Sequence, residues 1–361
     1  MKVLHISSEK SWRGGEQQIA YLLEETSTAG VENEVLCRKG SAFESYCRKH
    51  DIPYHAVSFS WVRLFRTAFI LKRLARNFDI IHAHTAKAHL LCYYALLVGM
   101  TTKVVVSRRV DFVPGSSYFT RKRYNHSGIS KYLCVSKAIE NIMRAYLYEG
   151  KDRCTTVYSG IDLNKFKANE NADIHSIYGL DKSLKLVVNT SALADHKDYF
   201  TFLDTVKMVS DQRNDVHFVV FGDGPMKQEI VSYSHNLNID RAVTFAGFVD
   251  NIPALLPDAD VFLITSKTEG LGTSIIDAFA CKVPVVATAA GGIPELIIDH
   301  KTGLLNNIGD VSSLTDSVIK LLDDQDLVNQ LTKGATERLQ LFTKENTAKA
   351  TIEVYKELIV N

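Results

Sequence analysis

Two acids and two glycines lie close together in the segment 265–279. Glu269 and Asp277 flank a turn that contains Gly270 and Gly272. The backbone N–H groups of such a turn, at the start of a helix, can bind the oxygens of a phosphate. Carboxylates beside a phosphate would repel it, so these two acids are expected to accept hydrogen bonds from hydroxyl groups. A nucleotide sugar offers both phosphates and hydroxyls, and it is the ligand that this pattern predicts.

The elements on either side of this turn explain how it would be positioned. The apolar run 260–264 predicts a buried parallel strand, and apolar periodicity predicts a helix that begins near Thr273 or Ser274. A strand that passes through glycines into a helix directs the helix N-terminus into the space beyond the strand. We therefore expect the amides of residues 270–274 to line a pyrophosphate site.

The rest of the chain alternates short apolar runs with helical patterns. Strands are predicted at 2–6, 34–37, 78–82, 103–107 and 132–135, and again at 185–190, 216–221, 243–245, 261–264 and 284–288. This alternation predicts an α/β fold with doubly wound parallel sheets. We expect one domain over 1–165, a second over 166–343 and a terminal helix over 344–361, with the polar stretch 161–181 as the linker.

Composition and charge set limits on the class of protein. The 361 residues are 46% hydrophobic and 23% charged, which is typical of a soluble protein with two domains. The six cysteines show no Cys-x2-Cys pair, which favours reduced, mostly buried thiols. The sequence contains neither a signal peptide nor an apolar run long enough to cross a bilayer, so we expect a cytoplasmic protein that is not integral to the membrane.

The small net charge of +1 hides an asymmetry between the two halves. Residues 1–165 carry 25 Lys+Arg and 14 Asp+Glu, a net of +11, whereas residues 166–361 carry 17 and 27, a net of −10. The basic half favours an anionic partner such as a membrane surface or a phosphate-bearing acceptor, and ordinary solvated charge is the alternative. Nucleic acid is not expected, because no nucleic-acid-binding module accompanies the charge.

The segment 61–76 is both basic and amphipathic. Trp61, Leu64, Phe65, Ala68, Leu71 and Ala75 are expected to share one face of a helix. A helix packed on the first domain explains this pattern, and the alternative is interfacial contact with a membrane, supported by the basic residues 121–123.

The turn and its neighbours resemble the Glu-x7-Glu signature of the retaining glycosyltransferases of family four, with Asp277 in the second acidic place. The resemblance extends through 280–288, 291–296 and 302–305. It also takes in 14–16, 157–162 with Phe166, and 222–225. This resemblance implies the GT-B fold, in which two Rossmann-like domains face each other across a cleft and the last helix crosses back to the first domain.

The resemblance also implies residue roles in the second domain. It places Lys197 on the leaving diphosphate, Glu269 on hydroxyls of the donor sugar and Asp277 on hydroxyls of the ribose. The family carries an Arg five residues before this Lys, but here that residue is Ala192, and His196 and Arg109 are candidates to replace it. The expected donor-binding residues are Gly15, Ser191, Lys197, Gly222, Phe248, Glu269, Gly270, Leu271, Gly272, Thr273, Ser274 and Asp277, with Lys197 and Glu269 as the catalytic candidates.

Candidates for the acceptor side lie in the first domain. Gly14 and Gly15 are predicted to form a loop that lets the backbone approach the ligands, and a simple turn is the alternative. Arg108 takes the place in which many family members carry a His that faces the donor sugar. An arginine there favours an anionic group, unless it forms a surface ion pair with Asp111. Gly14, Arg108 and Arg109 are the acceptor-side candidates.

Histidines do not suggest a metal site. His82, His84 and His89 are interpreted as loop residues without clustering, and the family resemblance implies that no metal or other cofactor is needed.

We expect a retaining, metal-independent glycosyltransferase that moves a hexose-type sugar from a nucleotide diphosphate-sugar to a saccharide or lipid-linked acceptor. Such a step belongs to the assembly of surface polysaccharide or lipopolysaccharide, at the inner face of the cytoplasmic membrane. One alternative is a GT-B epimerase that hydrolyses its nucleotide-sugar substrate. Another is a non-catalytic nucleotide-binding protein of the same fold, suggested by Ala192 and Asp277. The donor base (UDP or GDP), the sugar and the acceptor are left open.

Overall fold

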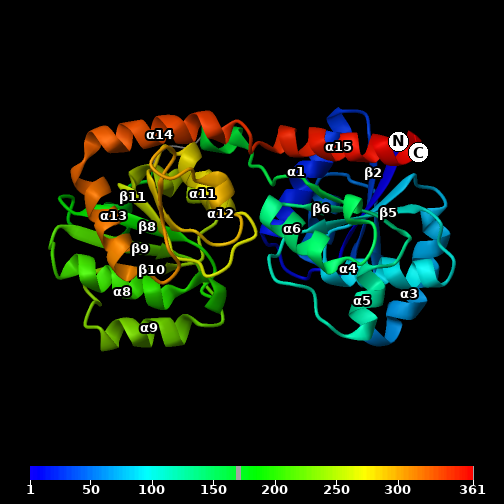
Figure 1. Cartoon of the computed structure of the whole chain (residues 1–361), viewed down its shortest axis with the longest axis horizontal. Helices are drawn as coiled ribbons and strands as arrows, with labels where there is room; N and C mark the ends of the chain where they lie inside the picture. The colour runs from blue at the N-terminus through cyan, green and yellow to red at the C-terminus, as the bar shows by residue number, and fades with distance from the viewer. Residues whose placement is uncertain (168–171, 361) are drawn as a thin grey trace. The chain divides into compact units, whose positions relative to one another are not determined.

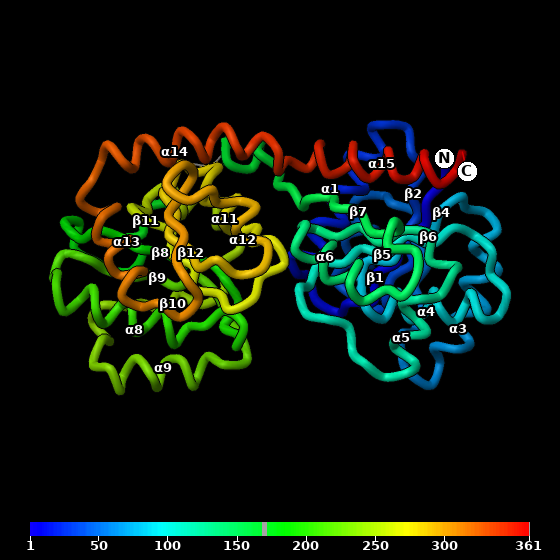
Figure 2. The backbone as a smooth tube through the Cα atoms, viewed as in Figure 1, coloured from blue at the N-terminus to red at the C-terminus, as the bar shows by residue number. Residues whose placement is uncertain are grey.

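The computed structural model describes residues 1–167 and 172–360 and divides into two compact α/β units (Figures 1 and 2). Unit 1 comprises Met1–Gly160 with Lys344–Asn361, and unit 2 comprises Ile161–Thr343. Part of the predicted linker, residues 168–171, lies outside the described residues.

The sheet of unit 1 has seven strands in the order β3-β2-β1-β4-β5-β6-β7, all of them parallel. The chain adds strands on one side of β1 and then on the other, so a topological switch point lies between β1 and β4. The strands are β1 (Lys2–Ser7), β2 (Glu32–Arg38), β3 (Tyr54–Val57), β4 (Ile80–Ala83), β5 (Lys103–Arg108), β6 (Ile129–Cys134) and β7 (Cys154–Thr156).

Helices cover both faces of this sheet (Figure 1). They are α1 (Gly14–Thr28), α2 (Ala42–Lys49), α3 (Trp61–Ala75), α4 (Ala86–Leu97), α5 (Tyr118–Tyr124), α6 (Lys137–Tyr146) and α15 (Lys344–Val360). The terminal helix α15 belongs to unit 1, because Val354 and Tyr355 are buried in a core cluster with residues of β1, β4 and β5. Ser136 caps α6, since its side chain accepts a hydrogen bond from the amide of Ile139.

Helix α3 presents two apolar faces, which corrects the single face expected from its sequence. Leu64 and Leu71 are buried in unit 1, and so are Ala68 and Ala75. In contrast, Trp61 and Phe65 are 66% and 54% exposed. Val62, Phe69 and Ile70 are exposed on the same helix. The packed-helix prediction therefore holds for one face, and a second face remains open.

Unit 2 has a six-stranded parallel sheet in the order β10-β9-β8-β11-β12-β13. Its strands are β8 (Lys185–Thr190), β9 (Val216–Phe221), β10 (Val243–Gly247), β11 (Val261–Ile264), β12 (Val285–Thr288) and β13 (Leu304–Asn306). The central strands β8, β9 and β11 are buried almost along their whole length, as expected of a parallel sheet covered on both faces.

The helices of unit 2 are α7 (Ile174–Tyr178), α8 (Tyr199–Ser210), α9 (Lys227–Asn236), α10 (Ile252–Leu255), α11 (Thr273–Ala280), α12 (Ile293–Leu296), α13 (Val311–Asp323) and α14 (Gln325–Leu339). Short 3₁₀ turns occur in unit 2 at η2 (Leu163–Phe166), η3 (Asp195–Lys197) and η4 (Leu256–Asp258), and in unit 1 at η1 (Lys151–Arg153). Side chains from α8 and α13 pack with those of β8, β9 and β11 in one core cluster.

Two further expectations can be compared with the described chain. All six cysteines are free and five of them are buried, which confirms the prediction of unpaired, mostly buried thiols. Within residues 1–167 and 172–360, no helix has both the length and the apolar character needed to cross a membrane.

Candidate functional site

Lys197 and Glu269, predicted from separate motifs, are in contact in unit 2. The Lys197 ammonium pairs with Oε2 of Glu269, and the two side chains are only 13% and 15% exposed. Lys197 lies in η3, after β8, and Glu269 lies between β11 and α11. Because β8 and β11 are neighbouring parallel strands, the loops after them meet at the same edge of the sheet. The pair therefore lies where ligands bind in open α/β sheets.

Side-chain hydrogen bonds hold these loops together. The Thr265 hydroxyl donates to the carbonyl oxygens of Lys197, at 3.2 Å, and Asp198, at 3.0 Å. The Thr288 hydroxyl, at the end of β12, donates to the Ser266 carbonyl at 2.7 Å. All three hydrogen bonds are buried or partly buried, so the loop that carries Lys197 is fixed relative to the loop that carries Glu269.

The turn after Glu269 carries a row of open amides. Gly272 caps α11 with a φ of 95°, a left-handed conformation that favours glycine, and the helix begins at Thr273 as predicted. Across the described residues, no hydrogen-bond acceptor is found for the amides of Gly270, Leu271, Gly272, Thr273 and Ser274. Five free N–H groups at the positive end of a helix are a suitable site for an anion.

Asp277 lies in the second turn of α11 and is partly buried. Burial raises the pKa of its carboxyl to about 7, and the nearby charge of Lys165 acts in the opposite direction. The part of the chain that the structure describes supplies no hydrogen-bond donor to this carboxylate. Lys165 was not identified from the sequence, because its effect on the Asp277 carboxyl arises only in the folded chain.

Ser191 and Gly222 are explained by local packing. The Ser191 hydroxyl lies 2.9 Å from Oδ1 of Asn189 and 2.7 Å from the hydroxyl of Tyr199. A Cβ atom on Gly222 would lie 1.9 Å from the Ser191 carbonyl oxygen, so only glycine fits. Phe248, just after β10, is 74% exposed.

Gly14 and Gly15 do not form a loop, which corrects the prediction for this segment. They are the first two residues of α1, and Arg13 is the N-cap. Neither has a positive φ, and a Cβ atom on either would meet no atom within 4 Å. The glycines therefore leave open space above the first turn of the helix.

The two predicted arginines differ in their surroundings. Arg108 is buried, and its guanidinium donates hydrogen bonds to the Tyr124 hydroxyl and to the Phe112 carbonyl. It forms no ion pair with Asp111 in the described structure. Arg109 is half-buried, and its Nε and Nη1 atoms are enclosed without a hydrogen-bond partner among the described residues. Nε of Arg108 is likewise enclosed without a partner, so among the described residues Arg108 has one donor without an acceptor and Arg109 has two.

The histidines are not loop residues, and the interpretation that they do not cluster is wrong. His82 lies in β4, His84 follows it, and both are buried against His5 of β1. His89 is buried in α4, where its ring packs edge-on against Tyr124. The register places His5 beside His82 in the sheet, which the sequence separation of the two strands conceals.

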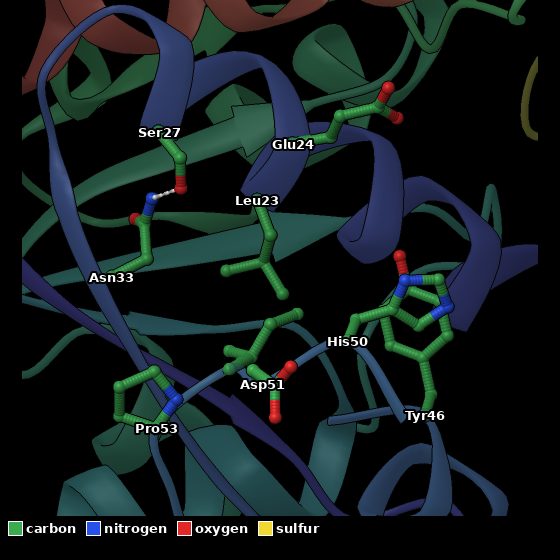
Figure 3. Close-up of a pocket in the computed structure, with 9 residues that line it drawn as sticks. Leu23, Glu24, Ser27, Asn33, Tyr46, His50, Asp51 and Pro53 are labelled. Carbon is green, nitrogen blue, oxygen red and sulfur yellow. Dashed lines mark hydrogen bonds between the residues drawn. The ribbon is translucent and has the colours of Figure 1, made fainter. Parts of the chain in front are cut away.

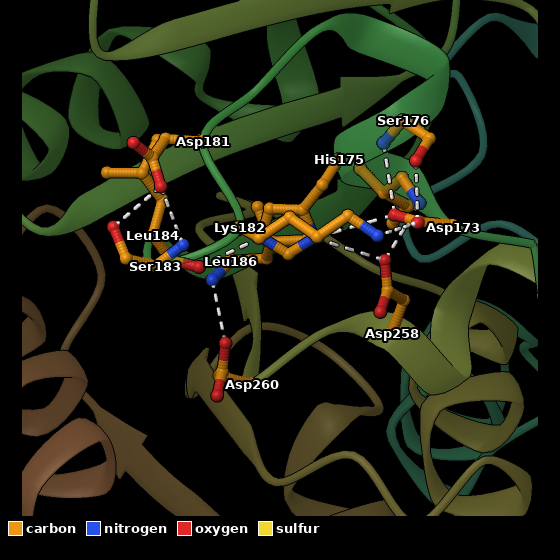
Figure 4. Close-up of polar contacts among 11 residues, drawn as sticks. Asp173, His175, Ser176, Asp181, Lys182, Ser183, Leu184, Leu186, Asp258 and Asp260 are labelled. Atoms are coloured by element: carbon orange, nitrogen blue, oxygen red, sulfur yellow. Dashed lines mark hydrogen bonds and ion pairs between the residues drawn. The ribbon is translucent and has the colours of Figure 1, made fainter.

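A second cluster in unit 2 combines Asp173, His175 and Asp258 (Figure 4). Asp173 caps α7 and pairs with Lys182 at 2.7 Å, and Asp258 accepts from the amide of Ile174 at 2.8 Å. These contacts anchor α7 and give each of the two carboxylates a partner within the described chain.

An open pocket of about 510 Å³ lies on unit 1 between α1, α2 and the loop before β3 (Figure 3). Leu23, Tyr46 and Pro53 are among the residues that line it. The residues recorded along its wall include none of those predicted for either substrate.

Comparisons with known proteins agree with this geometry. A family model described as "Glycosyl transferases group 1" matches residues 170–338, and one described as "Glycosyltransferase Family 4" matches residues 12–165. The chain is 28% identical over 291 residues to N-acetyl-alpha-D-glucosaminyl L-malate synthase of Bacillus anthracis, covering 78% of this chain and 76% of that protein. It is 21% identical over 351 residues to UDP-Gal:alpha-D-GlcNAc-diphosphoundecaprenol alpha-1,3-galactosyltransferase of Escherichia coli, covering 91% and 89%.

Solved structures share the fold of the whole chain. Anabaena Alr3699/HepE, in complex with UDP and glucose, superposes with a TM-score of 0.85 at 19% identity, covering 99% of this chain and 100% of that chain. A glycosyltransferase from Rickettsia africae ESF-5 gives a TM-score of 0.87 at 18% identity, covering 100% and 99%. With its two parallel-sheet units, the chain has the predicted GT-B fold.

Proposed function

Because the chain is a GT-B glycosyltransferase similar to family four and uses a nucleotide-sugar donor, we propose that it is a retaining hexosyltransferase. It would move the sugar to a saccharide or lipid-linked acceptor. The observation that carries this proposal is the contact of Lys197 with Glu269 beside the five open amides of residues 270–274. That group combines a cation and N–H donors for a diphosphate with an acid for sugar hydroxyls.

Donor binding would begin with a change of partner for Lys197. The Lys197 ammonium is neutralised by Glu269 in the structure. A diphosphate bound on the amides of residues 270–274 carries more negative charge than one carboxylate, and it would attract the ammonium to itself. Glu269 would then be free to accept hydrogen bonds from the donor sugar. Asp277, without a hydrogen-bond donor in the described chain, would accept from the ribose.

The same groups would assist departure of the nucleoside diphosphate. Negative charge develops on the leaving oxygen as the glycosidic bond to phosphate breaks. Lys197, the amides and the dipole of α11 are positioned to stabilise that charge. Since these groups supply positive potential without an ion, we propose a metal-independent reaction. The acceptor hydroxyl would attack the face that the diphosphate leaves, which retains the anomeric configuration.

Two features support a lipid-linked or surface-polysaccharide acceptor. The name of the Escherichia coli relative specifies a diphosphoundecaprenol-linked acceptor, and that of a Mycobacterium tuberculosis relative specifies a phosphatidylinositol mannoside. On this chain, the open apolar face of α3 is accompanied by the exposed residues Arg63, Arg66 and Arg73. Apolar and basic side chains together suit a peripheral position on an anionic membrane, which we propose is the inner face of the cytoplasmic membrane.

A transfer assay tests this function. The purified chain is incubated with UDP-hexoses and GDP-hexoses and with saccharide or lipid-linked acceptors, in buffer with and without EDTA. We expect acceptor-dependent release of nucleoside diphosphate that EDTA does not reduce, and a product with the anomeric configuration of the donor. Release of free sugar without an acceptor, or an inverted product, would contradict the proposal. The comparisons do not favour the epimerase or the non-catalytic alternative.

A further inference from the structure

Three buried histidines meet at the switch point between β1 and β4 in unit 1. Nδ1 of His5 lies 3.0 Å from Nε2 of His84, and the two rings are inclined by only 14°. Both nitrogens of His82 already contact hydroxyls, those of Tyr355 at 2.5 Å and Ser107 at 2.8 Å. The nitrogens of His5 and His84 thus face each other across one hydrogen bond, and although ligand atoms of all three histidines lie within 4.8 Å of one another, these nitrogens and both nitrogens of His82 already have hydrogen-bond partners.

The direction of this hydrogen bond is set by Asn33. Nδ2 of Asn33 donates to the Thr26 hydroxyl at 2.9 Å and lies 3.2 Å from the Val31 carbonyl (Figure 3 shows its further contact with Ser27). The Thr26 hydroxyl donates its proton to the Leu22 carbonyl, so it must be the acceptor in its hydrogen bond with Asn33. A flipped amide would place an oxygen against the Val31 carbonyl. Oδ1 of Asn33 therefore faces His5 and accepts from Nε2, at 3.0 Å.

This arrangement fixes the tautomers of two histidines in turn. Burial lowers the pKa of His5 to about 4 and that of His84 well below its ordinary value, so both rings are neutral at pH 7. A neutral His5 that donates from Nε2 has a lone pair on Nδ1. His84 must then donate to it from Nε2, which leaves a lone pair on Nδ1 of His84.

That last lone pair has no partner. Nδ1 of His84 is enclosed and lacks a hydrogen bond to any described residue, and Nε and Nη1 of Arg109 are in the same condition. His84 follows β4 and Arg109 follows β5, and these are neighbouring parallel strands, so both residues lie at the same edge of the sheet, where the charge of Arg109 acts on His84. An acceptor atom beside N–H donors suits a group that both donates and accepts, and a hydroxyl does so.

The local charge favours an uncharged ligand over an anion. Glu16 is buried, bonds to the Ser7 hydroxyl at 3.0 Å, and its charge acts on Arg109. With the histidines neutral, the carboxylate of Glu16 offsets the guanidinium of Arg109. Glu16 thereby reduces the positive charge that Arg109 could use to offset the cost of desolvating a phosphate or carboxylate.

The location fits a substrate site. His84 follows β4 directly, and the ends of β1 and β4 are joined by the hydroxyls of Ser8 and Thr85, 2.7 Å apart. Ligands of open α/β sheets bind at the carboxyl ends of the strands at a switch point. We propose that His84 and Arg109 bind an uncharged hydroxyl group of the saccharide acceptor, and that Asn33, acting through His5, is a positioning residue for His84. The inference rests on the proposed transferase function.

Nitrogen NMR of the full chain labelled at histidine tests the relay directly. We expect His84 to carry its proton on Nε2 in the unsubstituted protein, which a packing role alone does not require. In Asn33→Asp the carboxylate favours a charged His5, which must donate from Nδ1, so His84 should change to the Nδ1–H tautomer. Ser27→Ala is the matched control, because it removes a contact of Asn33 without freeing the amide to flip. An Nδ1–H tautomer of His84 in the unsubstituted protein would overturn the proposal, whether or not Asn33→Asp folds.

Matched probes then test the ligand. Methyl α-D-glucopyranoside, which has hydroxyls and no charge, should shift the signals of His84 Nδ1 and Arg109 Nε, and bind about tenfold more weakly to Asn33→Asp. Sulfate, which has anionic oxygens and no hydroxyl, should not shift them. An unmoved His84 with the glucoside, or an equal response to sulfate, would overturn the subsite. Nucleoside diphosphate release, measured separately, decides the transferase proposal, so either can fail alone.

Discussion

The Lys197 ammonium and the Glu269 carboxylate neutralise each other, although they come from loops 72 residues apart. We expect this ion pair to separate before Lys197 can bind the donor diphosphate and Glu269 can bind the donor sugar. Neither side chain is fully buried, so each can still exchange its partner for a ligand. Substitutions of Lys197 and of Glu269 should therefore have different effects on nucleotide binding and on transfer.

Lys197→Ala should lower kcat by about 10²–10³-fold, because one of the charges that stabilise the leaving diphosphate is lost. The melting temperature should also fall, since the Glu269 carboxylate is only 15% exposed and would lose its charged partner. Steady-state assays and thermal melts measure both quantities. Lys207→Ala is the matched control, because Lys207 pairs with Asp211 at the surface outside the donor site. Near-normal turnover of Lys197→Ala would exclude its role on the diphosphate.

Glu269→Gln should separate binding from transfer. Removing the carboxylate frees Lys197 from its competing partner, so UDP or GDP should bind several-fold more tightly by calorimetry. Transfer should nevertheless fall sharply, because the donor sugar loses its acceptor of hydrogen bonds. Asp211→Asn serves as the control for removal of a lysine-paired acid. Weaker nucleotide binding together with unchanged transfer would assign Glu269 a purely structural role.

Asp277 should make stability depend on pH with a defined sign. Its pKa is raised by burial to about 7, so the folded chain binds a proton that the unfolded chain has already released above about pH 4. The free energy of unfolding should therefore fall as pH rises from 4 to 7, by up to about 1.4 kcal/mol per pH unit. Asp277→Asn should remove this contribution. Denaturant titrations of both proteins at several pH values measure the difference, and parallel curves would contradict the assignment.

Gly222→Ala should destabilise unit 2 by about 1–3 kcal/mol, because its Cβ would lie 1.9 Å from the Ser191 carbonyl oxygen. Gly15→Ala offers the opposite case. Its Cβ meets no atom within 4 Å, and alanine favours the helical conformation of α1, so the fold should be retained or slightly stabilised. If Gly15→Ala folds but transfers poorly, the open space above α1 is used by a substrate. Urea titration and the transfer assay provide the two readouts.

Trp61→Ser and Phe65→Ser should weaken co-sedimentation with anionic vesicles, because both side chains are exposed on the open face of α3. Binding should also weaken as salt rises, since each nearby basic residue contributes roughly 1 kcal/mol to attraction to the surface. Ile177→Ser, at a 55% exposed position in the acidic unit 2, is the control. Equal binding to neutral and anionic vesicles, or none to either, would leave α3 as ordinary solvated surface.

Not all of the basic residues expected at this surface are free to reach it. Lys72 donates to the Val98 carbonyl at the end of α4, and Arg123 has an enclosed Nε and stacks on Tyr124. Arg63, Arg66, Arg73 and Arg76 are exposed. The vesicle experiment therefore concerns α3 more than the segment 121–123.

Central strands were predictable from sequence because parallel strands buried on both faces are continuous apolar runs. β8, β9 and β11 occur where those runs lie. β3, β7 and β13 were not predicted. Each lies at the edge of its sheet, is short and is only partly buried, so its residues carry little apolar signal.

The turn before α11 could likewise be predicted from the sequence. The start of α11 at Thr273 depends on local features, namely the preceding strand, two glycines and the helical spacing of apolar residues. The sequence by itself determined the alternation of elements, the position of that turn and the residue types around it. Only the tertiary structure decided that Lys197 meets Glu269, that Lys165 approaches Asp277 and that His5 lies against His84. The Lys197–Glu269 and His5–His84 contacts join residues 72 and 79 positions apart, and strand order and register, which depend on the packing of the whole sheet, bring them together.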